Sequence, residues 1–202
     1  MAFNISNFTA QGLKYGGIRP SLFDVTITPP TNVGSTASGI TQFNFMCKAA
    51  SIPQMDVSPI DVPYFGRKIK VAGERPSFPN WEVEVMCDED YAVRAMFEKW
   101  NDSINRLVSN IRDPRLDSEG ADGYKNVATV NSYGKDGSTL RIYEFIGIWP
   151  CKISEIKLDW DSSNKVGSFM VEFAYDYWLP AFEVSTKGSG ADTYLADSQS
   201  SV

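Results

Sequence analysis

Glu82 and Glu84 are the two residues whose type and spacing best fit catalytic chemistry. They lie two positions apart in a run that alternates apolar and polar residues, so in a β-strand they would share one face. Two carboxylates on one face could serve as acid and base in glycoside hydrolysis. A solvated strand face has the same spacing, and we favour that interpretation because no other pattern in the sequence supports catalysis.

The remaining candidates for chemistry have structural explanations. Asp88, Glu89 and Asp90 precede an amphipathic run, and the first turn of a helix favours anions. The acidic segment 113–122 does not have the spacing of a calcium-binding loop. No glycine-rich phosphate loop lies between a strand and a helix. The sequence therefore predicts neither a metal ion nor a cofactor.

The sequence contains no histidine, which excludes Ser-His-Asp and Cys-His catalysis and most zinc sites. Cys47, Cys87 and Cys151 are far apart and include no C-x-x-C pair. We expect them to be reduced, buried and apolar in character. The residue types thus argue against an enzyme.

Charge and hydropathy narrow the class of protein further. The 202 residues carry a net charge of −6, from 25 acidic and 19 basic side chains, which disfavours a surface built to neutralise phosphates. Neither a membrane-spanning run of about 20 apolar residues nor an N-terminal signal pattern is present. We therefore expect a soluble protein made in the cytoplasm.

Alternating apolar and polar residues predict a mainly β (α+β) fold with about seven or eight antiparallel strands. Strands that alternate without repeated helical crossovers favour an antiparallel β-barrel or sandwich. The clearest predicted strands span residues 21–28, 43–47, 81–87, 127–133, 139–149, 152–160 and 168–178.

Residues 88–111 predict the one convincing α-helix, since apolar residues recur with helical spacing and Asp113-Pro114 follows. Its single apolar stripe needs a sheet to cover, so we expect one flanking amphipathic helix. We assign residues 1–184 to one domain. Residues 185–202, rich in Ser, Gly and Asp, predict a flexible tail.

Prolines and glycines surround two short strand-like runs at 57–62 and 67–72, and the mixed basic and apolar pattern of the second run predicts a projecting arm or a sheet edge. A two-stranded hairpin alone is marginally stable, so this arm needs a partner. Apolar and basic residues on an otherwise acidic protein fit a complementary surface of another subunit. The candidate interface residues are Tyr64, Phe65, Arg67, Lys68, Ile69 and Lys70.

Three segments resemble, in this order, the tail tube proteins of contractile-tailed bacteriophages of the T-even type. They are IDVPYFGRKIKV at 60–71, WEVEV at 81–85 and DYAVR at 90–94. The aromatic segment FAYDYW at 173–178 is similar to that family as well. The resemblance extends from about Arg19 to Pro180.

The resemblance implies a small β-barrel subunit that forms hexameric rings, stacked into a hollow tube that carries DNA into the host. It implies assembly in the host cytoplasm and a final place in the virion tail. The implied partners are further copies of this chain and the sheath, tape-measure, baseplate and tail-terminator proteins. Double-stranded DNA would pass without specific binding, and segment 57–73 would be the projecting hairpin arm that reaches a neighbouring ring.

A lumen wall bearing carboxylates would repel passing DNA, because electrostatic screening acts over about 8 Å at physiological salt. The candidates lie opposite the apolar faces of predicted strands, and alternation alone leaves a second set equally open. The first set is Glu82, Glu84, Glu172 and Asp176, and the second is Glu155 and Asp159.

Other functions stay open at this point. The chain could be the tube protein of a secretion system or of a phage-like bacteriocin, or a baseplate subunit that initiates the tube. An initiator needs only one stacking face, whereas a tube subunit needs two. A carbohydrate-binding or hydrolytic β-sandwich is an alternative of another class, and saccharide binding by a discrete monomer would distinguish it.

Overall fold

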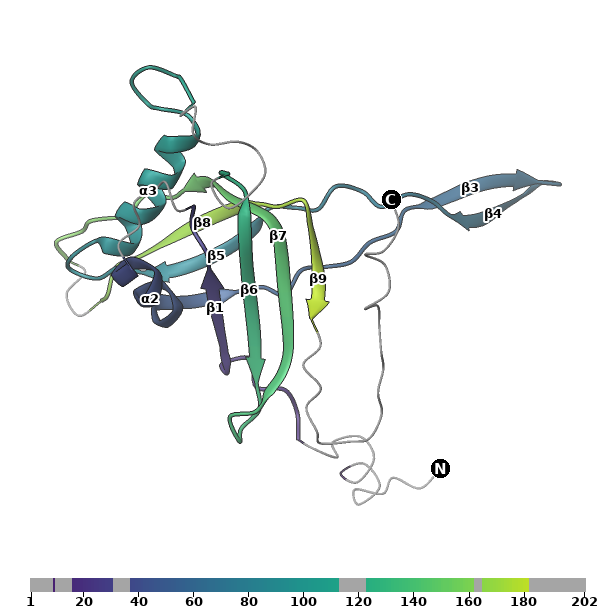
Figure 1. Ribbon diagram of the computed structural model, residues 1–202. Helices are drawn as coiled ribbons and strands as arrows, with labels where there is room; N and C mark the ends of the chain where they lie inside the picture. The colour runs from purple at the N-terminus through teal and green to yellow at the C-terminus, as the bar shows by residue number, and fades with distance from the viewer. Residues whose placement is uncertain (1–8, 10–15, 31–36, 113–122, 162–164, 182–202) are drawn as a thin grey trace.

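A bent, seven-stranded antiparallel sheet forms the body of the protein (Figure 1). The computed structural model describes residues 9, 16–30, 37–112, 123–161 and 165–181. The predicted tail at 185–202 and the acidic segment at 113–122 lie outside these ranges. The longest strand is β7 (Thr139–Ile153). On one side it pairs with β6 (Asn126–Tyr133), which pairs with β1 (Phe23–Ile27).

On its other side β7 pairs with β8 (Ser168–Ala174) and β9 (Tyr177–Ala181). The two short strands are one ladder in a continuous register, since Trp149 faces Ala174 and Ile146 faces Tyr177. The single strand predicted at 168–178 is therefore interrupted by a bend at residues 175 and 176 without a change of pairing.

Beyond β8 the sheet continues through β5 (Trp81–Met86) to β2 (Cys47–Ala50). Among the described residues no pairing joins β2 to β1, so the predicted barrel is not closed. Part of the reason lies in residues predicted as a strand at 43–47, most of which belong to helix α2 (Ala37–Met46). That helix contacts β1, β5 and the second helix.

The second helix, α3, spans Ala92–Ile104 and is shorter than the predicted 88–111. Asp90, not Asp88, accepts the hydrogen bond from the amide of Ala92 at its start, at 3.0 Å. The helix buries four residues of the predicted stripe: Val93, Met96, Phe97 and Trp100. The apolar residues after it, Leu107, Val108 and Ile111, are exposed. The part of the chain described here thus has two helices where one was predicted.

Aromatic contacts hold the core between the bent sheet and the helices. Trp81 of β5 stacks on Phe145 of β7 with ring centroids 4.3 Å apart, and Phe97 of α3 meets Phe43 of α2 edge to face at 5.5 Å. The indole of Trp100 donates a hydrogen bond to the carbonyl of Tyr124 at 3.0 Å. Buried aromatic pairs of this kind stabilise a core beyond their burial alone.

The strand predicted at 152–160 is wrong beyond Ile153. β7 instead continues through Pro150, and the chain leaves the sheet afterwards, with Leu158 and Trp160 exposed. Proline fits there because β7 has β8 on only one side after residue 148, and edge strands tolerate proline. Ile156 still packs against the core, but the alternation from residue 157 to 160 has no opposing surface to cover it.

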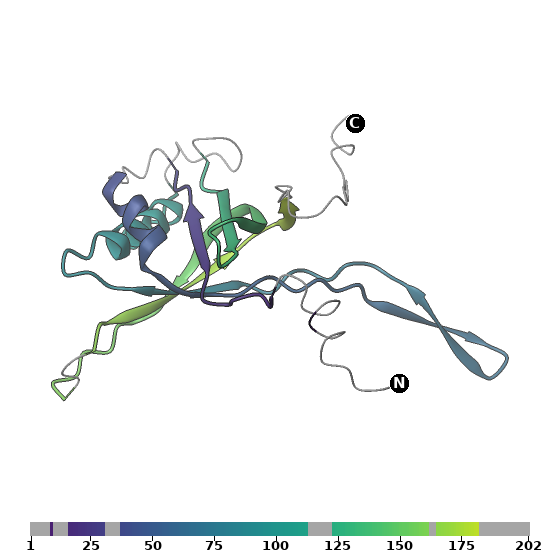
Figure 2. The same cartoon turned by 90° about the horizontal axis from the view of Figure 1, so that it is seen from below.

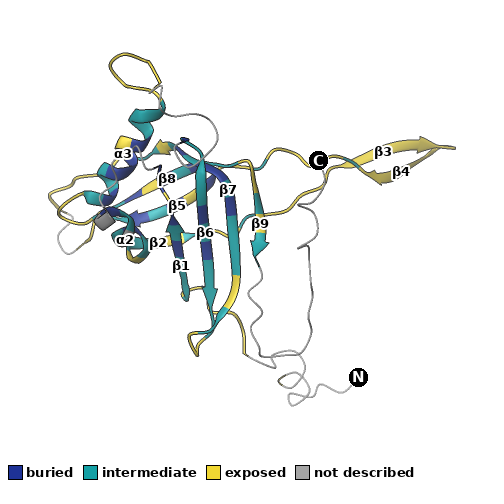
Figure 3. Ribbon diagram, viewed as in Figure 1, coloured by how far each residue is buried: buried dark blue, intermediate teal, exposed yellow. Residues whose placement is uncertain are grey.

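β3 (Pro59–Tyr64) and β4 (Arg67–Ala72) form a separate two-stranded sheet. They project from the body as an arm (Figures 1 and 2). Every residue of the two strands is exposed (Figure 3). The hairpin predicted within 57–73 is thus present.

The bend in β7 generates the first testable prediction. Gly147 has φ +70°, and a Cβ there would lie 2.1 Å from a carboxylate oxygen of Asp176. Gly147→Ala therefore combines left-handed strain with a clash, and we expect a loss of about 2–4 kcal/mol in unfolding free energy, measured by urea denaturation.

Gly137→Ala is the matched control. Gly137 has φ +78°, but no atom lies within 4 Å of the position that a Cβ would take at this turn. Strain alone predicts a loss of about 1–2 kcal/mol. Equal losses in the two variants would show that the contact with Asp176 does not matter.

Candidate assembly surfaces

The arm has one apolar face and one basic face, because the hairpin register sorts its side chains. Ile60 faces Val71 and Val62 faces Ile69, so these apolar residues share a face. The opposite face carries the pairs Asp61 with Lys70 and Pro63 with Lys68. Ile60, Val62 and Val71 were missed as interface candidates, although their period of two was readable in the sequence.

The tip of the arm presents two aromatic rings. Phe65 is 91% exposed and packs edge to face on Tyr64 with ring centroids 4.7 Å apart. Phe65 and Gly66 both have positive φ, 43° and 78°, as a tight two-residue hairpin turn requires. A bulky side chain in that backbone region is strained, and exposure to water gives no compensation.

The arm's predicted basic residues lie on different faces. Arg67 faces Tyr64 at the apolar side, whereas Lys68 and Lys70 lie on the other side. Lys68 is 3.9 Å from the carboxylate of Asp61, a loose and exposed ion pair that contributes little to stability. Arg67, Lys68 and Lys70 remain available to acidic groups of a partner.

Three of the four first-choice acids share the polar face of the sheet. Glu82 faces Glu172 across β5 and β8, and Glu84 is on the same side. The opposite side of these strands is the buried core face. Asp176 lies apart, at the bend between β8 and β9, where both its carboxylate oxygens accept hydrogen bonds from Lys125 at 2.8 Å.

Lysines accompany two of the carboxylates on that face. Lys48 lies 2.7 Å from Glu84, and Lys152 forms an ion pair with Glu172. Hydrogen bonds from Lys48 and then Ser168 lower the pKa of Glu84, and the bond from Lys152 lowers that of Glu172. The face therefore carries an excess of one carboxylate over lysine, rather than an unbroken acidic wall.

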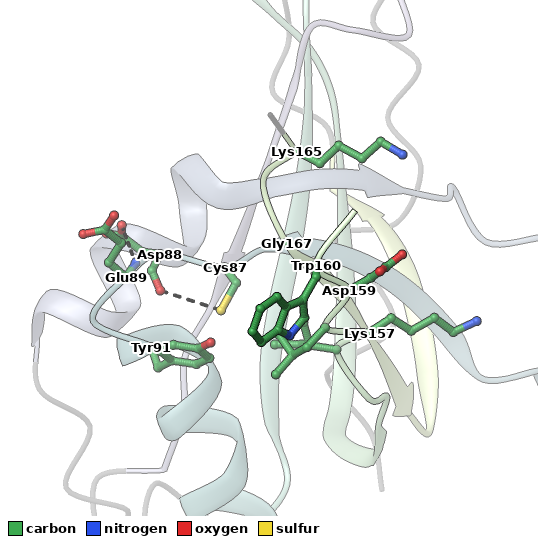
Figure 4. A pocket seen from close by; sticks show the side chains of 11 residues that line it. Cys87, Asp88, Glu89, Tyr91, Lys157, Asp159, Trp160, Lys165 and Gly167 are labelled. Atoms are coloured by element: carbon green, nitrogen blue, oxygen red, sulfur yellow. Dashed lines mark hydrogen bonds between the residues drawn. The ribbon is translucent and has the colours of Figure 1, made fainter. Parts of the chain in front are cut away.

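The second-choice acids do not belong to this face. Glu155 and Asp159 follow the end of β7 and are exposed. Asp159 lines a groove of about 490 Å³ at the end of the sheet opposite the arm (Figures 2 and 4). The groove is lined by Cys87, Asp88, Glu89, Tyr91, Ile156, Lys157, Leu158, Asp159, Trp160, Lys165 and Gly167.

The strand edges form a further surface. After Ile148, β7 pairs only with β8, and β2 pairs only with β5, within the described residues. The strands β7, β8, β5 and β2 thus form a sheet with a free edge at each end. Unpaired strand edges present backbone donors and acceptors to another chain.

The remaining candidates for chemistry form no site among the described residues. No cluster of three metal-ligating side chains occurs in the described ranges, and none of the helices they contain is long and apolar enough to cross a membrane. The three cysteines are free but half-buried, not fully buried as expected. Burial raises the pKa of Cys47 to about 12, so its thiol is unreactive at neutral pH.

The phage tail tube protein family matches residues 18–181 of this chain. Tail tube protein gp19 of Enterobacteria phage T4 is 38% identical over 161 residues, which cover 79% of this chain and 90% of that protein. The corresponding protein of phage T6 is 37% identical over 161 residues. The chain belongs to the phage tail tube protein family. It is a structural component of the tail of a contractile-tailed phage.

Solved structures show the same fold at low sequence identity. A chain of the sheath-tube complex of an extracellular contractile injection system has a TM-score of 0.53 and 14% identity, covering 89% of this chain and 99% of that one. A chain of the anti-feeding prophage tube-terminating cap has a TM-score of 0.55 and 14% identity, covering 83% and 92%.

The ion pair on the polar face gives a prediction about pH. Glu84 has a folded-state pKa below its ordinary value of 4.5, so its stabilising effect is present above that value and is lost as the pH falls through the folded pKa. We expect Glu84→Gln to lower the unfolding free energy by about 0.5–1 kcal/mol at about pH 7 and by nearly nothing at about pH 3.

Urea unfolding at both pH values measures this effect. Ser168→Ala is the partial control, because it removes one hydrogen bond to Glu84 and leaves the Lys48 pair. An equal loss for Glu84→Gln at both pH values would contradict the assignment to a charged carboxylate.

Proposed function

We propose that this chain forms hexameric rings that stack into the hollow tube of a contractile phage tail, through which double-stranded DNA enters the host. The observation that carries the proposal is the exposed amphipathic arm on a body with two free sheet edges. The arm supports contact along the tube axis, and the free sheet edges support contact around the ring.

Ring formation follows from the free edges. The edge of β2 in one copy pairs with the edge formed by the last residues of β7 in the next copy. Such a pairing is heterologous, so it continues until rotation closes the ring. Closure removes the exposed edges that an isolated subunit would present. The sheet of β7, β8, β5 and β2 then becomes part of a barrel shared by all copies.

Stacking follows from the arm. Ile60, Val62, Ile69 and Val71 are about half exposed in the subunit, and burial of such side chains stabilises an interface by about 25 cal/mol per Å² of apolar surface. Tyr64 and Phe65 add aromatic contact area, and Arg67, Lys68 and Lys70 pair with acids of the neighbouring ring. An initiator would need only one stacking face, whereas this subunit offers two different ends.

The polar face of the shared sheet lines the lumen in this arrangement, because the other face is covered by α3 and the core. Glu82, Glu84 and Glu172 then face DNA, with Lys48 and Lys152 among them. The wall is weakly acidic and richly hydrated. The wall offers no continuous row of basic residues, so counterion release would not hold the DNA on it. Asp176, at the bend, is a structural residue in this proposal.

The role is non-catalytic and needs no cofactor. The sheath, tape-measure, baseplate and tail-terminator proteins are the proposed partners besides further copies of the chain. Proteins of similar fold support three of these, since they come from a sheath-tube complex, a sheath/tube terminator and a baseplate. Identity of 38% to a phage tail tube protein, against 14% to injection-system chains, favours a phage tail over a secretion tube.

Electron microscopy of the purified chain, with and without a baseplate preparation, tests the proposal. We expect rings or hollow tubes. Arg67→Glu combined with Lys68→Glu should abolish the stacking of rings into tubes while the circular dichroism spectrum stays unchanged, since charge reversal turns attraction into repulsion. Lys99→Glu with Lys135→Glu applies the same charge change away from the arm and should leave assembly intact.

A chain that stays monomeric at high concentration even with baseplates would overturn the tube proposal. Normal tubes from the Arg67→Glu, Lys68→Glu variant would refute only the electrostatic role of the arm.

The lumen assignment predicts that Glu82→Lys tubes bind DNA. The change converts an excess of one carboxylate into an excess of one lysine on each subunit's polar face, and the repeat multiplies that charge along the tube. We expect salt-sensitive retention of double-stranded DNA in co-sedimentation at low salt. Glu98→Lys, on α3, is the matched control, and equal retention by both variants would place Glu82 outside the lumen.

A further inference from the structure

The groove that Asp159 lines has no role in the body of the subunit. It lies between the segment leading into α3 and the chain that follows β7 (Figure 4). Its large apolar side chains face solvent: Trp160 is 103% exposed, Leu158 85% and Tyr91 48%. Such a concentration of exposed large apolar residues marks a binding surface.

The groove and the arm lie at opposite ends of the molecule. The arm extends from the junction between β2 and β5, whereas the groove lies where β5 ends and β8 begins (Figures 1 and 2). Two different surfaces at opposite ends make a head-to-tail contact, which repeats without limit along one direction. Subunits that stack in the same orientation therefore bring the arm end of one copy toward the groove end of the next.

Charges on the two surfaces are complementary. Asp88 and Glu89 lie on one side of the groove, whereas Lys157 and Lys165 lie on the other together with Asp159 (Figure 4), so the lining carries three carboxylates and two lysines. The arm carries the basic residues Lys68 and Lys70 next to the acidic Asp61 on one face, and its Arg67 at the other.

The arm tip and the groove both present exposed aromatic rings. Tyr64 and Phe65 at the arm tip are 60% and 91% exposed. Trp160 and Tyr91 offer rings of the same kind in the groove, which favours edge-to-face or offset contacts. Phe65 holds a strained backbone conformation at the tip, φ 43°, and burial against these rings supplies the compensation that water does not.

We propose that the groove formed by Cys87–Tyr91, Ile156–Trp160 and Lys165–Gly167 is the receptor for the β3–β4 arm of a second copy of this chain. The arm tip packs against Trp160 and Leu158, and the arm's lysines meet Asp88 and Glu89. This inference rests on the proposed function and specifies which surface the arm reaches.

The first experiment measures the critical concentration for assembly, by sedimentation and electron microscopy of baseplate-seeded samples. Trp160→Ala removes an exposed side chain and should leave the fold intact, which circular dichroism checks. We expect a rise of about tenfold or more in critical concentration, as for an interface anchor. Val108→Ala, at a residue 101% exposed beyond α3, is the matched control and should assemble like the wild type.

The second experiment places the two surfaces next to each other directly. Arg67→Cys and Lys157→Cys copies, which keep Phe65 and Trp160 and each also carry Cys87→Ala, are mixed, assembled and treated with a short bis-maleimide. Linked pairs should form only in mixtures that contain both cysteines and only after assembly. Replacing the Lys157→Cys copy with a Val108→Cys copy should abolish them.

The outcomes separate the inference from the proposed function. Normal assembly of Trp160→Ala together with no linked pairs, while the wild type forms tubes, overturns the receptor assignment and leaves the tube intact. Trp160→Ala tubes that form normally but fail to bind sheath would assign the groove to the sheath and also overturn it. A wild-type chain that forms neither rings nor tubes overturns both.

Discussion

The shared bend of β7 and the β8–β9 ladder sets the shape on which the other surfaces depend. Gly147 takes a left-handed conformation against Asp176, and Lys125 holds both oxygens of that carboxylate. Because the pairing register continues across the bend, the ladder changes direction without an unpaired stretch of backbone. The bend encloses the core on one side and carries the end of β7 beyond β6, where it becomes a free edge.

The core of the subunit is buried, whereas several apolar or unpaired surfaces are left uncovered. The aromatic contacts of Trp81, Phe145 and Trp100 are buried, so the exposure of the arm does not reflect a loosely packed body. A hairpin with an apolar face, two open edges and a groove with an exposed tryptophan all lack a covering element within the described ranges. In the proposed tube, each of these surfaces would be covered by another copy of the chain.

The strands predicted from sequence periodicity are correct where the local alternation agrees with the packing in the folded chain. The strands around Val25, Val83 and Val130 bury the residues that the period of two predicts. It failed at Phe43, where the same residues suit a helix that packs on α3, and at Trp160, where alternation occurs in an exposed segment. It overestimated α3 because Leu107 and Val108 continue the helical spacing after Ile104 but have no surface to cover.

Four features were readable in the amino-acid sequence: the mainly β class, the absence of histidine chemistry, the projecting arm and, through the segment at 60–71, the resemblance to tail tube proteins. These features depend on local periodicity and on residue identity. Three further features required the folded structure: within the described residues the barrel of one chain stays open, lysines accompany Glu84 and Glu172, and a groove lies opposite the arm. Those features depend on contacts between distant segments, and no local pattern of side chains encodes which strands become neighbours.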